Sequence, residues 1–419
     1  MNKPKMERRQ FIKLLGAGSL VALAPPLARA ATTPHVIVVG GGFAGATCAK
    51  YLKLWGGTSV QVTLIEENPN YVSPILSNLI LTGDQTVSDL TFGYQPLKDR
   101  YGLQIVHGRV DGIATGAQTV TLNTGQVLSY DRLVLAPGID FIAAPGHDFD
   151  KIPHAWQAGA QTTLLKNQLD AMPSGGHFVM SIPRAPYRCP PGPYERACVV
   201  ADNLLKKGMA YQITVLDGND DIIVERDTFG DKFAQYGIDY RPGCTVTSVN
   251  ADNRSLAFTD PVGNTETLSA DVLNVIPPQK AGEAIFTAGV NNGNWAPVSV
   301  LSYESQIKSN VHIIGDAQGS GQPKAGHIGN SEAKVCADAI LRLLSGRQPD
   351  PSPKTNSACY SPVSRNTASW LTAVYEYNSS TQAMQPVQGA GYPASGAPSA
   401  ENYRHMFDWS ENLFADTFA

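Results

Sequence analysis

Short apolar runs alternate with helical patterns near the start of the chain. The run His35–Val39 leads into a glycine-rich turn, and a helical pattern follows from Ala46 to about Leu54. A second apolar run, Val60–Ile65, ends at Glu66. Continuous apolar strands on either side of a helix are typical of parallel strands that helices cover. The pattern therefore predicts a βαβ unit.

The same pattern returns further along the chain. Strand Phe178–Ile182, a helix from about Glu195 to Lys206 and strand Gln212–Leu216 form a second predicted unit. Other predicted elements are strands at 104–107, 119–122, 132–135, 272–276 and 311–314, a helix at 331–344, and aromatic-bearing stretches at 369–377 and 403–418. Residues 345–353 are rich in Pro, Gly and Ser and are interpreted as a linker. The sequence therefore predicts an α/β fold.

The first thirty residues have the pattern of an export signal. Arg8-Arg9 precede an apolar run from Leu14 to Leu27, and Ala28-Arg29-Ala30 supplies a small-x-small cleavage site. We therefore expect a twin-arginine signal peptide at 1–30 and a periplasmic location. The alternative, a short membrane anchor, is disfavoured because the run is too short and too weakly apolar to span a bilayer well. No later run reaches about 18 apolar residues, so no integral membrane segment is expected.

Composition and charge exclude some classes of protein. Hydrophobic residues make up 42% and charged residues 16% of the chain, which is a globular composition. Residues 1–30 carry six basic side chains and one acidic one, so their removal changes the formal charge from −4 to about −9. So acidic a protein is a poor nucleic-acid binder, whereas a basic protein partner is compatible with this charge.

The glycine-rich turn predicts a dinucleotide site. Gly40, Gly42 and Gly45 have the spacing that allows a tight turn, close approach of a pyrophosphate, and close packing of helix on strand. The helix N-terminus offers free N–H groups to the phosphates. Glu66, at the end of the second strand, is placed to accept the ribose hydroxyls.

Two further segments favour a flavin. Pro137-Gly138 follows one predicted strand, and Gly315-Asp316 follows another, where Asp316 is a candidate for the ribityl chain. The order of these motifs resembles flavoproteins with two dinucleotide-binding domains, in which both ends of the chain build the FAD domain. The resemblance implies two Rossmann-like domains, with FAD bound by 34–148 and 285–346, a second domain at 149–284 and a C-terminal α+β interface domain at 354–419.

The second domain lacks a nicotinamide motif. Its turn, Pro183–Glu195, contains prolines, which remove N–H donors and add bulk where a pyrophosphate would approach. Cys189 stands in this turn instead. We therefore expect a small, thiol-reactive electron donor and no NAD(P)H.

The six cysteines and eight histidines show no metal-ligand spacing, and no Cys-x-x-Cys-His motif is present. We therefore expect neither a metal site nor a haem on this chain. The sequence leaves the pairing of four cysteines open, although each fits a structural role better than a catalytic one: Cys48, Cys198, Cys244 and Cys336.

The mature chain resembles the flavoprotein subunit of flavocytochrome c sulfide dehydrogenase. The matching segments are Val38–Gly42, Thr63–Glu66, Ala136–Gly138, Pro153–Trp156, Arg188–Arg196, Ile276–Gln279, Gly315–Ala317 and Cys359–Ser361. The resemblance implies a redox-active disulfide of Cys189 with Cys359, Glu195 as an acid/base, hydrosulfide as substrate, and a heterodimer in which haem c lies on a separate cytochrome subunit. Members often tether the flavin through a cysteine where this chain has Pro74, so we predict non-covalent FAD.

Several alternatives stay open. Cys189 and Cys359 also fit a structural disulfide, and Glu195 also fits an exposed carboxylate at a helix N-terminus. Lys324 either stabilises negative charge on reduced flavin or is solvated. Sulfide:quinone oxidoreductase and a non-enzymatic flavin redox carrier are the competing functions. The sequence does not indicate which cysteine receives the sulfur.

Overall fold

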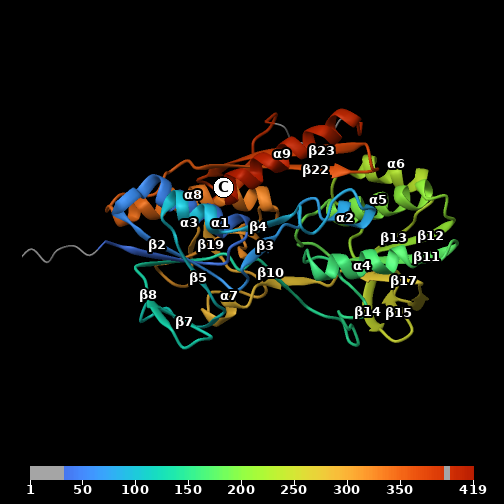
Figure 1. Cartoon of the computed structure of the whole chain (residues 1–419), viewed down its shortest axis with the longest axis horizontal. Coiled ribbons are helices and arrows are strands. Elements are labelled where there is room, and N and C mark those ends of the chain that lie inside the picture. The colour runs from blue at the N-terminus through green and yellow to red at the C-terminus, as the bar shows by residue number, and fades with distance from the viewer. Residues whose placement is uncertain (1–32, 391–396) are drawn as a thin grey trace, which may run out of the picture. The chain divides into compact units, whose positions relative to one another are not determined.

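Two largely parallel sheets organise the described part of the chain, residues 33–390 and 397–419 of a computed structural model, and Pro34–Ala419 forms one unit (Figure 1). The predicted signal peptide at 1–30 lies outside the described residues. The first sheet has the order β19-β20-β21-β9-β1-β2-β5, and its central strands β21, β9, β1, β2 and β5 are parallel. Its strands are β1 (His35–Val39), β2 (Gln61–Glu66), β5 (Gln104–His107), β9 (Arg132–Leu135), β19 (Val298–Ser299), β20 (Glu304–Ser305) and β21 (Val311–Ile313).

Segments far apart in the sequence build this sheet. Strand β21 pairs with β9 in parallel, so residues after 298 complete a sheet that begins at His35. The central strands are almost wholly buried, as continuous apolar runs in a parallel sheet require. The discontinuous architecture expected for the first domain is therefore present.

The second sheet is parallel throughout and has the order β13-β12-β11-β17. Its strands are β11 (Gly176–Ile182), β12 (Tyr211–Asp217), β13 (Asp239–Pro242) and β17 (Val272–Val275). Antiparallel strands β10 (Ile139–Phe141) and β18 (Gln279–Ala281) pair where the chain passes between the two sheets. The remaining small strands are β3 (Asn70–Val72), β4 (Thr91–Gly93), β6 (Val110–Ala114), β7 (Thr119–Leu122), β8 (Val127–Ser129), β14 (Thr245–Asn250), β15 (Ser255–Thr259) and β16 (Thr265–Ser269).

Helices cover both sheets. Helices α1 (Phe43–Gly56) and α8 (Gly326–Leu344) pack closely because small residues face each other, as at Ala44 and Gly329. The other helices of this part are α2 (Asn78–Thr82), α3 (Gln95–Tyr101), α4 (Ala160–Asp170), α5 (Gly192–Lys206), α6 (Arg226–Tyr236) and α7 (Ala284–Thr287). None of the helices within 33–390 and 397–419 is long and apolar enough to cross a membrane.

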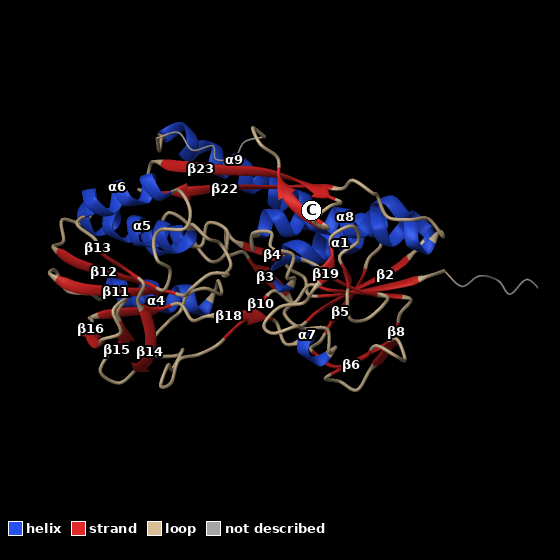
Figure 2. Ribbon diagram, turned by 180° about the vertical axis from the view of Figure 1, so that it is seen from behind, coloured by secondary structure: helices blue, strands red, loops and turns tan. Residues whose placement is uncertain are grey.

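A C-terminal layer extends across both sheet domains (Figures 1 and 2). It consists of β22 (Lys354–Pro362), β23 (Ala368–Asn378), β24 (Ala383–Pro386) and α9 (Ala400–Phe418). Strand β22 contacts α8 of the first domain and α5 of the second, and α9 packs on β22, β23 and α1. This layer therefore carries residues such as Cys359 from the end of the chain to the second domain.

The structure confirms the predicted α/β class and corrects several boundaries. Helix α5 begins at Gly192 rather than near Glu195, because Pro191 and Pro193 suit the first turn of a helix. Helix α8 begins at Gly326 rather than near Ser331. Strand β22 was not predicted, because its exposed and buried positions do not form a clear alternation around Cys359.

Candidate active site

The glycine-rich turn joins β1 to α1 and leaves no room for larger residues. A Cβ atom on Gly45 would lie 1.8 Å from the Gly40 oxygen, and one on Gly40 would lie 2.3 Å from the Ala136 oxygen. Gly40 also has a φ of +101°, which L-residues rarely adopt. The first and third glycines are therefore required by the packing of the protein itself.

Beside this turn lies a cavity of about 350 Å³. Its lining includes Gly40, Gly42, Glu66, Pro137, Gly138, Gly315 and Asp316. Gly45 lies beneath the turn and supports it, whereas Lys324 does not line the cavity. The structure thus brings together most of the residues predicted to bind the cofactor.

The donors and acceptors at this cavity fit a dinucleotide. The carboxylate of Glu66 accepts hydrogen bonds from the backbone N–H groups of Gly41 (2.7 Å) and Asn68 (2.9 Å). These bonds hold it at the end of β2, at the edge of the cavity. The N-terminus of the 14-residue helix α1 lies at the same cavity and offers its dipole to a pyrophosphate.

The side chain of Lys324 binds backbone atoms of the cavity wall. Its ammonium group donates to the backbone oxygens of Asp316 (2.8 Å) and Gln318 (2.7 Å) and lies 3.7 Å from the centre of the Trp295 ring. Burial lowers its pKa to about 8. The geometry therefore gives Lys324 a part in holding the 316–318 turn, and its burial contradicts the solvated alternative; its stabilisation of negative charge on reduced flavin stays a prediction.

Glu332 holds the same turn from the other side. It is fully buried on α8 and accepts from the Gly315 N–H (2.8 Å) and the Gln318 amide (2.9 Å). Burial raises the pKa of Glu332 to about 8. Asp316, between these anchors, lines the cavity, and burial raises its pKa although Arg188 and Lys324 oppose the shift.

The corresponding turn of the second domain is filled by protein. Asn219 accepts from the Ala185 N–H (2.9 Å) and donates to the Pro183 oxygen (3.2 Å), which folds the proline-rich loop against the end of β12. Asp217, at that strand end, accepts from the hydroxyls of Tyr194 (2.7 Å) and Tyr240 (2.8 Å). The carboxylate in the position analogous to Glu66 is therefore already satisfied by tyrosines.

A second cavity, about 80 Å³ in volume, contains the predicted catalytic residues. Cys189, Glu195 and Cys359 all line it. It shares four lining residues with the dinucleotide cavity: Pro74, Arg188, Ala325 and Gly326. The cysteines and the dinucleotide site are therefore neighbours.

Local backbone geometry presents Cys189 to this cavity. Its φ of +57° is unusual for a non-glycine residue, and its N–H donates to the Lys324 oxygen (2.7 Å). A Cβ on Gly192 would lie 2.8 Å from the Cys189 sulfur, so the glycine that begins α5 makes space for the thiol. Burial, followed by the nearby Cys359, raises the pKa of Cys189 well above the usual value for a thiol.

Glu195 belongs to a buried polar group. Its side chain is 8% exposed, and it accepts a hydrogen bond from the Asn78 amide (2.8 Å). The oxygen of the same amide accepts from Arg196 Nε (2.9 Å), so Asn78 connects the carboxyl to the guanidinium. Burial raises the pKa of Glu195 to about 8 and lowers that of Arg196 to about 9. The exposed-carboxylate alternative for Glu195 is therefore wrong.

Arg196 is the largest fully buried side chain of this group. It donates to the backbone oxygens of His154 (3.1 Å) and Ala155 (2.6 Å) and to the Asn274 side chain (2.9 Å). Its guanidinium lies 4.8 Å from the centre of the Trp156 ring. Hydrogen bonds to segments far apart in the sequence therefore hold this side chain at the cavity wall.

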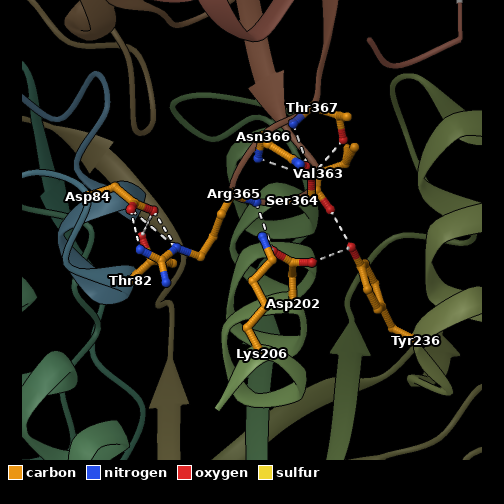
Figure 3. A network of polar contacts seen from close by, with 10 residues as sticks. All are labelled: Thr82, Asp84, Asp202, Lys206, Tyr236, Val363, Ser364, Arg365, Asn366 and Thr367. Carbon is orange, nitrogen blue, oxygen red and sulfur yellow. Dashed lines mark hydrogen bonds and ion pairs between the residues drawn. The ribbon is translucent and has the colours of Figure 1, made fainter. Parts of the chain in front are cut away.

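Both ends of β22, which carries Cys359, are anchored. Toward its start, the Asn356 N–H donates to the Ser331 hydroxyl (3.1 Å) of α8, and next to Cys359 the Ala358 N–H donates to His327 Nδ1 (2.9 Å) of the same helix. Beyond its end, Arg365 forms an ion pair with Asp84, and its N–H donates to Asp202 of α5 (2.8 Å) (Figure 3). Cys359 therefore faces the cavity from a strand held between the two domains. Burial, followed by the charge of Glu225, raises the pKa of Cys359 to about 12.

All six cysteines are free thiols in the structure, and the Cys189–Cys359 disulfide stays a prediction. The other four are buried: Cys48, Cys198, Cys244 and Cys336. No group of three His, Cys, Asp or Glu side chains within the described ranges is arranged to hold a metal ion. Pro74 lines both cavities, and the neighbouring Ser73 hydroxyl bonds to Ile75 backbone atoms. The non-covalent state of FAD also stays a prediction.

Sequence reasoning missed Asn78, Glu332 and the roles of Arg188 and Arg196. Arg188 and Arg196 lie in the same short run as Cys189 and Glu195, which was a usable signal. Asn78 is 117 residues from Glu195, and Glu332 lies within an ordinary amphipathic helix, so no local pattern identifies them.

Three family models match parts of the chain. One described as the central part of the sulfide dehydrogenase [flavocytochrome c] flavoprotein chain matches residues 162–277, and one for flavocytochrome c sulphide dehydrogenase, flavin-binding, matches 351–418. A pyridine nucleotide-disulphide oxidoreductase model matches 34–164. The last two support FAD as the cofactor of the dinucleotide cavity.

Individual relatives and solved structures are also similar to this chain. The sulfide dehydrogenase flavoprotein chain of Chlorobaculum thiosulfatiphilum is 46% identical over 48 residues, which are 12% of this chain and 98% of that sequence. The sulfide-quinone reductase of Aquifex aeolicus is 23% identical over 350 residues, 78% of this chain and 80% of that protein. The solved Aquifex aeolicus sulfide:quinone oxidoreductase has a TM-score of 0.78 at 19% identity, with 92% of each chain covered. The chain therefore belongs to the family of flavocytochrome c sulfide dehydrogenase flavoprotein chains, and it is a flavin oxidoreductase of the sulfide-oxidising type.

Proposed function

We propose that this chain oxidises hydrosulfide to sulfur or polysulfide through a Cys189–Cys359 disulfide beside FAD, and passes the electrons to a c-type cytochrome subunit in the periplasm. One observation carries the proposal: Cys189, Cys359 and Glu195 line one cavity that shares four residues with the dinucleotide cavity. When bound, FAD supplies a two-electron acceptor next to the cysteines.

The chain's own residues perform a thiol–disulfide exchange. The hydrosulfide sulfur forms a bond to one cysteine sulfur, the Cys189–Cys359 bond breaks, and the other cysteine leaves as a thiolate. The disulfide gains two electrons, and the incoming sulfur becomes the outer atom of a persulfide. Arg188 lies on the cavity wall and favours negative charge near Cys189.

Glu195 supplies the proton transfer. With a pKa of about 8 it exchanges its proton near neutral pH, which is the range in which an acid/base group is most effective. Asn78 keeps its carboxyl at the cavity. Glu195 thus takes the proton that hydrosulfide loses, or returns one to a cysteine thiolate.

Cys359→Ser tests the proposed role of the cysteine pair. Anaerobic titration with sulfide is expected to bleach the flavin absorbance of the native protein and to leave that of the variant unchanged. Cys244→Ser, which changes a buried thiol outside the cavity, is the matched control and keeps full bleaching. Unchanged sulfide-dependent bleaching in Cys359→Ser would remove the disulfide from the scheme. Failure of sulfide to bleach the native flavin would favour the non-enzymatic carrier.

The electron acceptor is a separate question, because the chain matches both flavocytochrome c flavoprotein chains and a sulfide-quinone reductase. The similarity to Aquifex aeolicus sulfide-quinone reductase favours quinone, whereas the two flavocytochrome c family models favour a cytochrome. The formal charge of about −9 after removal of residues 1–30 suits a basic partner. Turnover with sulfide is expected to be faster with a c-type cytochrome than with a soluble quinone, and the opposite order would favour the quinone enzyme. Cell fractionation tests the periplasmic location.

A further inference from the structure

Hydrogen bonds from three separate segments hold the backbone at Cys189. The Arg188 N–H donates to Oε1 of Gln279 on β18 (2.8 Å), and the Arg188 carbonyl accepts from Nε1 of Trp156 (3.0 Å). The Cys189 N–H donates to the backbone oxygen of Lys324 (2.7 Å). Three consecutive polar groups of this backbone are therefore bonded to residues that lie far from it in the sequence.

The conformation that these bonds hold is a strained one. Cys189 has a φ of +57°, in the left-handed region that residues other than glycine seldom adopt. A strained backbone of this kind persists only where the surrounding contacts determine it. Cys189 lines the same cavity as Cys359 in this conformation. The bonds therefore offset the strain of a backbone that places the sulfur in the shared cavity.

Gln279 is bonded through one end of its amide. Its side chain is 4% exposed, and its Nε2 atom is buried and has no hydrogen-bond partner within the described part of the chain. An apolar side chain of similar length would avoid the cost of this unpaired donor. Stability alone therefore does not explain a glutamine at this position, whereas its bond to Arg188 does.

Trp156 is itself fixed by its neighbours. Its backbone N–H donates to His154 Nδ1 (2.9 Å), and the guanidinium of Arg196 lies 4.8 Å from the centre of its ring. Trp156 is 6% exposed and lines the cavity of the cysteines. The donor to the Arg188 carbonyl thus belongs to the buried core of the second domain rather than to the loop of Cys189.

We propose that Gln279 and Trp156 are positioning residues of the cysteine pair, which hold Cys189 in its left-handed conformation so that its sulfur stays in the cavity with Cys359. The inference rests on the proposed function and deepens it, because it concerns the disulfide that the sulfide reaction uses. Two thiols that are already positioned lose less conformational freedom on forming a disulfide than two mobile ones. The bonds at Arg188 therefore favour the Cys189–Cys359 disulfide over the dithiol.

Equilibration with mixtures of reduced and oxidised dithiothreitol measures this preference. As their disulfide forms, Cys189 and Cys359 lose two electrons and two protons, which oxidised dithiothreitol takes up to become the dithiol. Full-length, FAD-loaded protein is equilibrated anaerobically at neutral pH and quenched with acid, and mass spectrometry quantifies the disulfide. Gln279→Met removes the acceptor and keeps a side chain of similar length. We expect the equilibrium constant for disulfide formation to fall about fivefold, which corresponds to a reduction potential about 20 mV higher.

Two further variants separate the lost bond from other effects. Gln279→Glu keeps an acceptor for the Arg188 N–H and is expected to keep the native constant within about twofold. Burial raises the pKa of both thiols, so the added carboxyl has little effect on them at neutral pH. Gln306→Met removes an amide that donates to the Val298 oxygen (3.0 Å), outside the residues that line the cavity, and is the matched control.

Trp156→Phe removes the indole N–H and is expected to shift the constant in the same direction as Gln279→Met. A native constant in folded Gln279→Met overturns the inference, and if that variant does not fold, a native constant in Trp156→Phe does so. An equal shift in Gln279→Met and Gln279→Glu also overturns it, because the lost acceptor is then not the cause. If the native protein forms no Cys189–Cys359 disulfide at any ratio of the reagents, the proposed disulfide chemistry fails and this inference fails with it, so the two failures are distinguishable.

Discussion

Replacement of Glu195 by glutamine removes the ionisable proton of the carboxyl group and keeps the size and shape of the side chain almost unchanged. Gln has the same shape as Glu and still accepts the hydrogen bond from the Asn78 amide, which is 2.8 Å in the native protein. Arg196 keeps its bonds to Asn78 and to the backbone oxygens of His154 and Ala155. The variant therefore isolates the acid/base function from the architecture of the cavity.

The structure sets the size of the expected effect. Burial raises the pKa of Glu195 from 4.5 to about 8, which corresponds to roughly 5 kcal/mol in favour of the protonated form. At pH 7 about nine in ten molecules then hold the proton, and the group ionises just above neutral pH, where a positioned acid/base contributes about 10²–10⁴-fold to a rate. We expect Glu195→Gln to lower the rate of flavin reduction by sulfide by about 10²-fold or more near neutral pH.

Stopped-flow absorbance of the flavin, measured anaerobically across a pH series, checks this expectation. The ionisation of sulfide affects both proteins equally, so the ratio of native to variant rates at each pH cancels it. That ratio is expected to change around pH 8, the pKa of Glu195. Glu266→Gln, which removes a carboxylate exposed on β16, serves as the control. A ratio near one at every pH would refute the acid/base role of Glu195.

Three further predictions follow from other parts of the structure. Gly45→Ala is expected to abolish FAD retention, measured by flavin absorbance after desalting, because its Cβ would lie 1.8 Å from a backbone oxygen; Gly230→Ala, whose Cβ meets nothing within 4 Å, is expected to retain it. Native protein that is denatured and desalted is expected to lose its flavin colour, because Pro74 has no nucleophile, and colour that stays with the polypeptide would contradict this. Asp84→Asn is expected to lower hydrogen-exchange protection of β22 by about 1 kcal/mol, since its ion pair with Arg365 is partly exposed and screened. Burial opposes ionisation of Asp84, but bonds from Arg365 lower its pKa, so this contribution is present at neutral pH and lost as pH falls through that pKa.

Local sequence was sufficient where the chemistry lies within one βαβ unit. The turn of Gly40 and Gly45 was predictable because its spacing reflects backbone contacts between residues only a few positions apart. The lack of a nicotinamide motif in the second domain was also predictable, because the prolines of the 183–193 loop can be read directly from the sequence. The sequence also predicted that Cys189 precedes a helix, although that helix begins three residues earlier than expected.

Other features depend on contacts that no short window contains. Asn78 joins Glu195 to Arg196 from more than a hundred residues away, and Glu225 reaches β22 across 136 residues. The orientation of Lys324 toward backbone oxygens, rather than toward the cavity, likewise depends on the fold around Trp295. Pairing of β21 with β9 is equally non-local.

The sequence by itself determined the class of the fold and the glycine-rich turn, because hydrophobic periodicity and backbone conformation are set by neighbouring residues. The pair Cys189 and Cys359 came from the resemblance of short motifs to flavocytochrome c sulfide dehydrogenase. The tertiary structure alone decided the protonation of the site. Burial raises the pKa of Glu195, and the C-terminal layer brings Cys359 into the cavity of Cys189. Desolvation and charge proximity arise only when distant segments exclude water together, so a linear pattern of residues does not encode them locally.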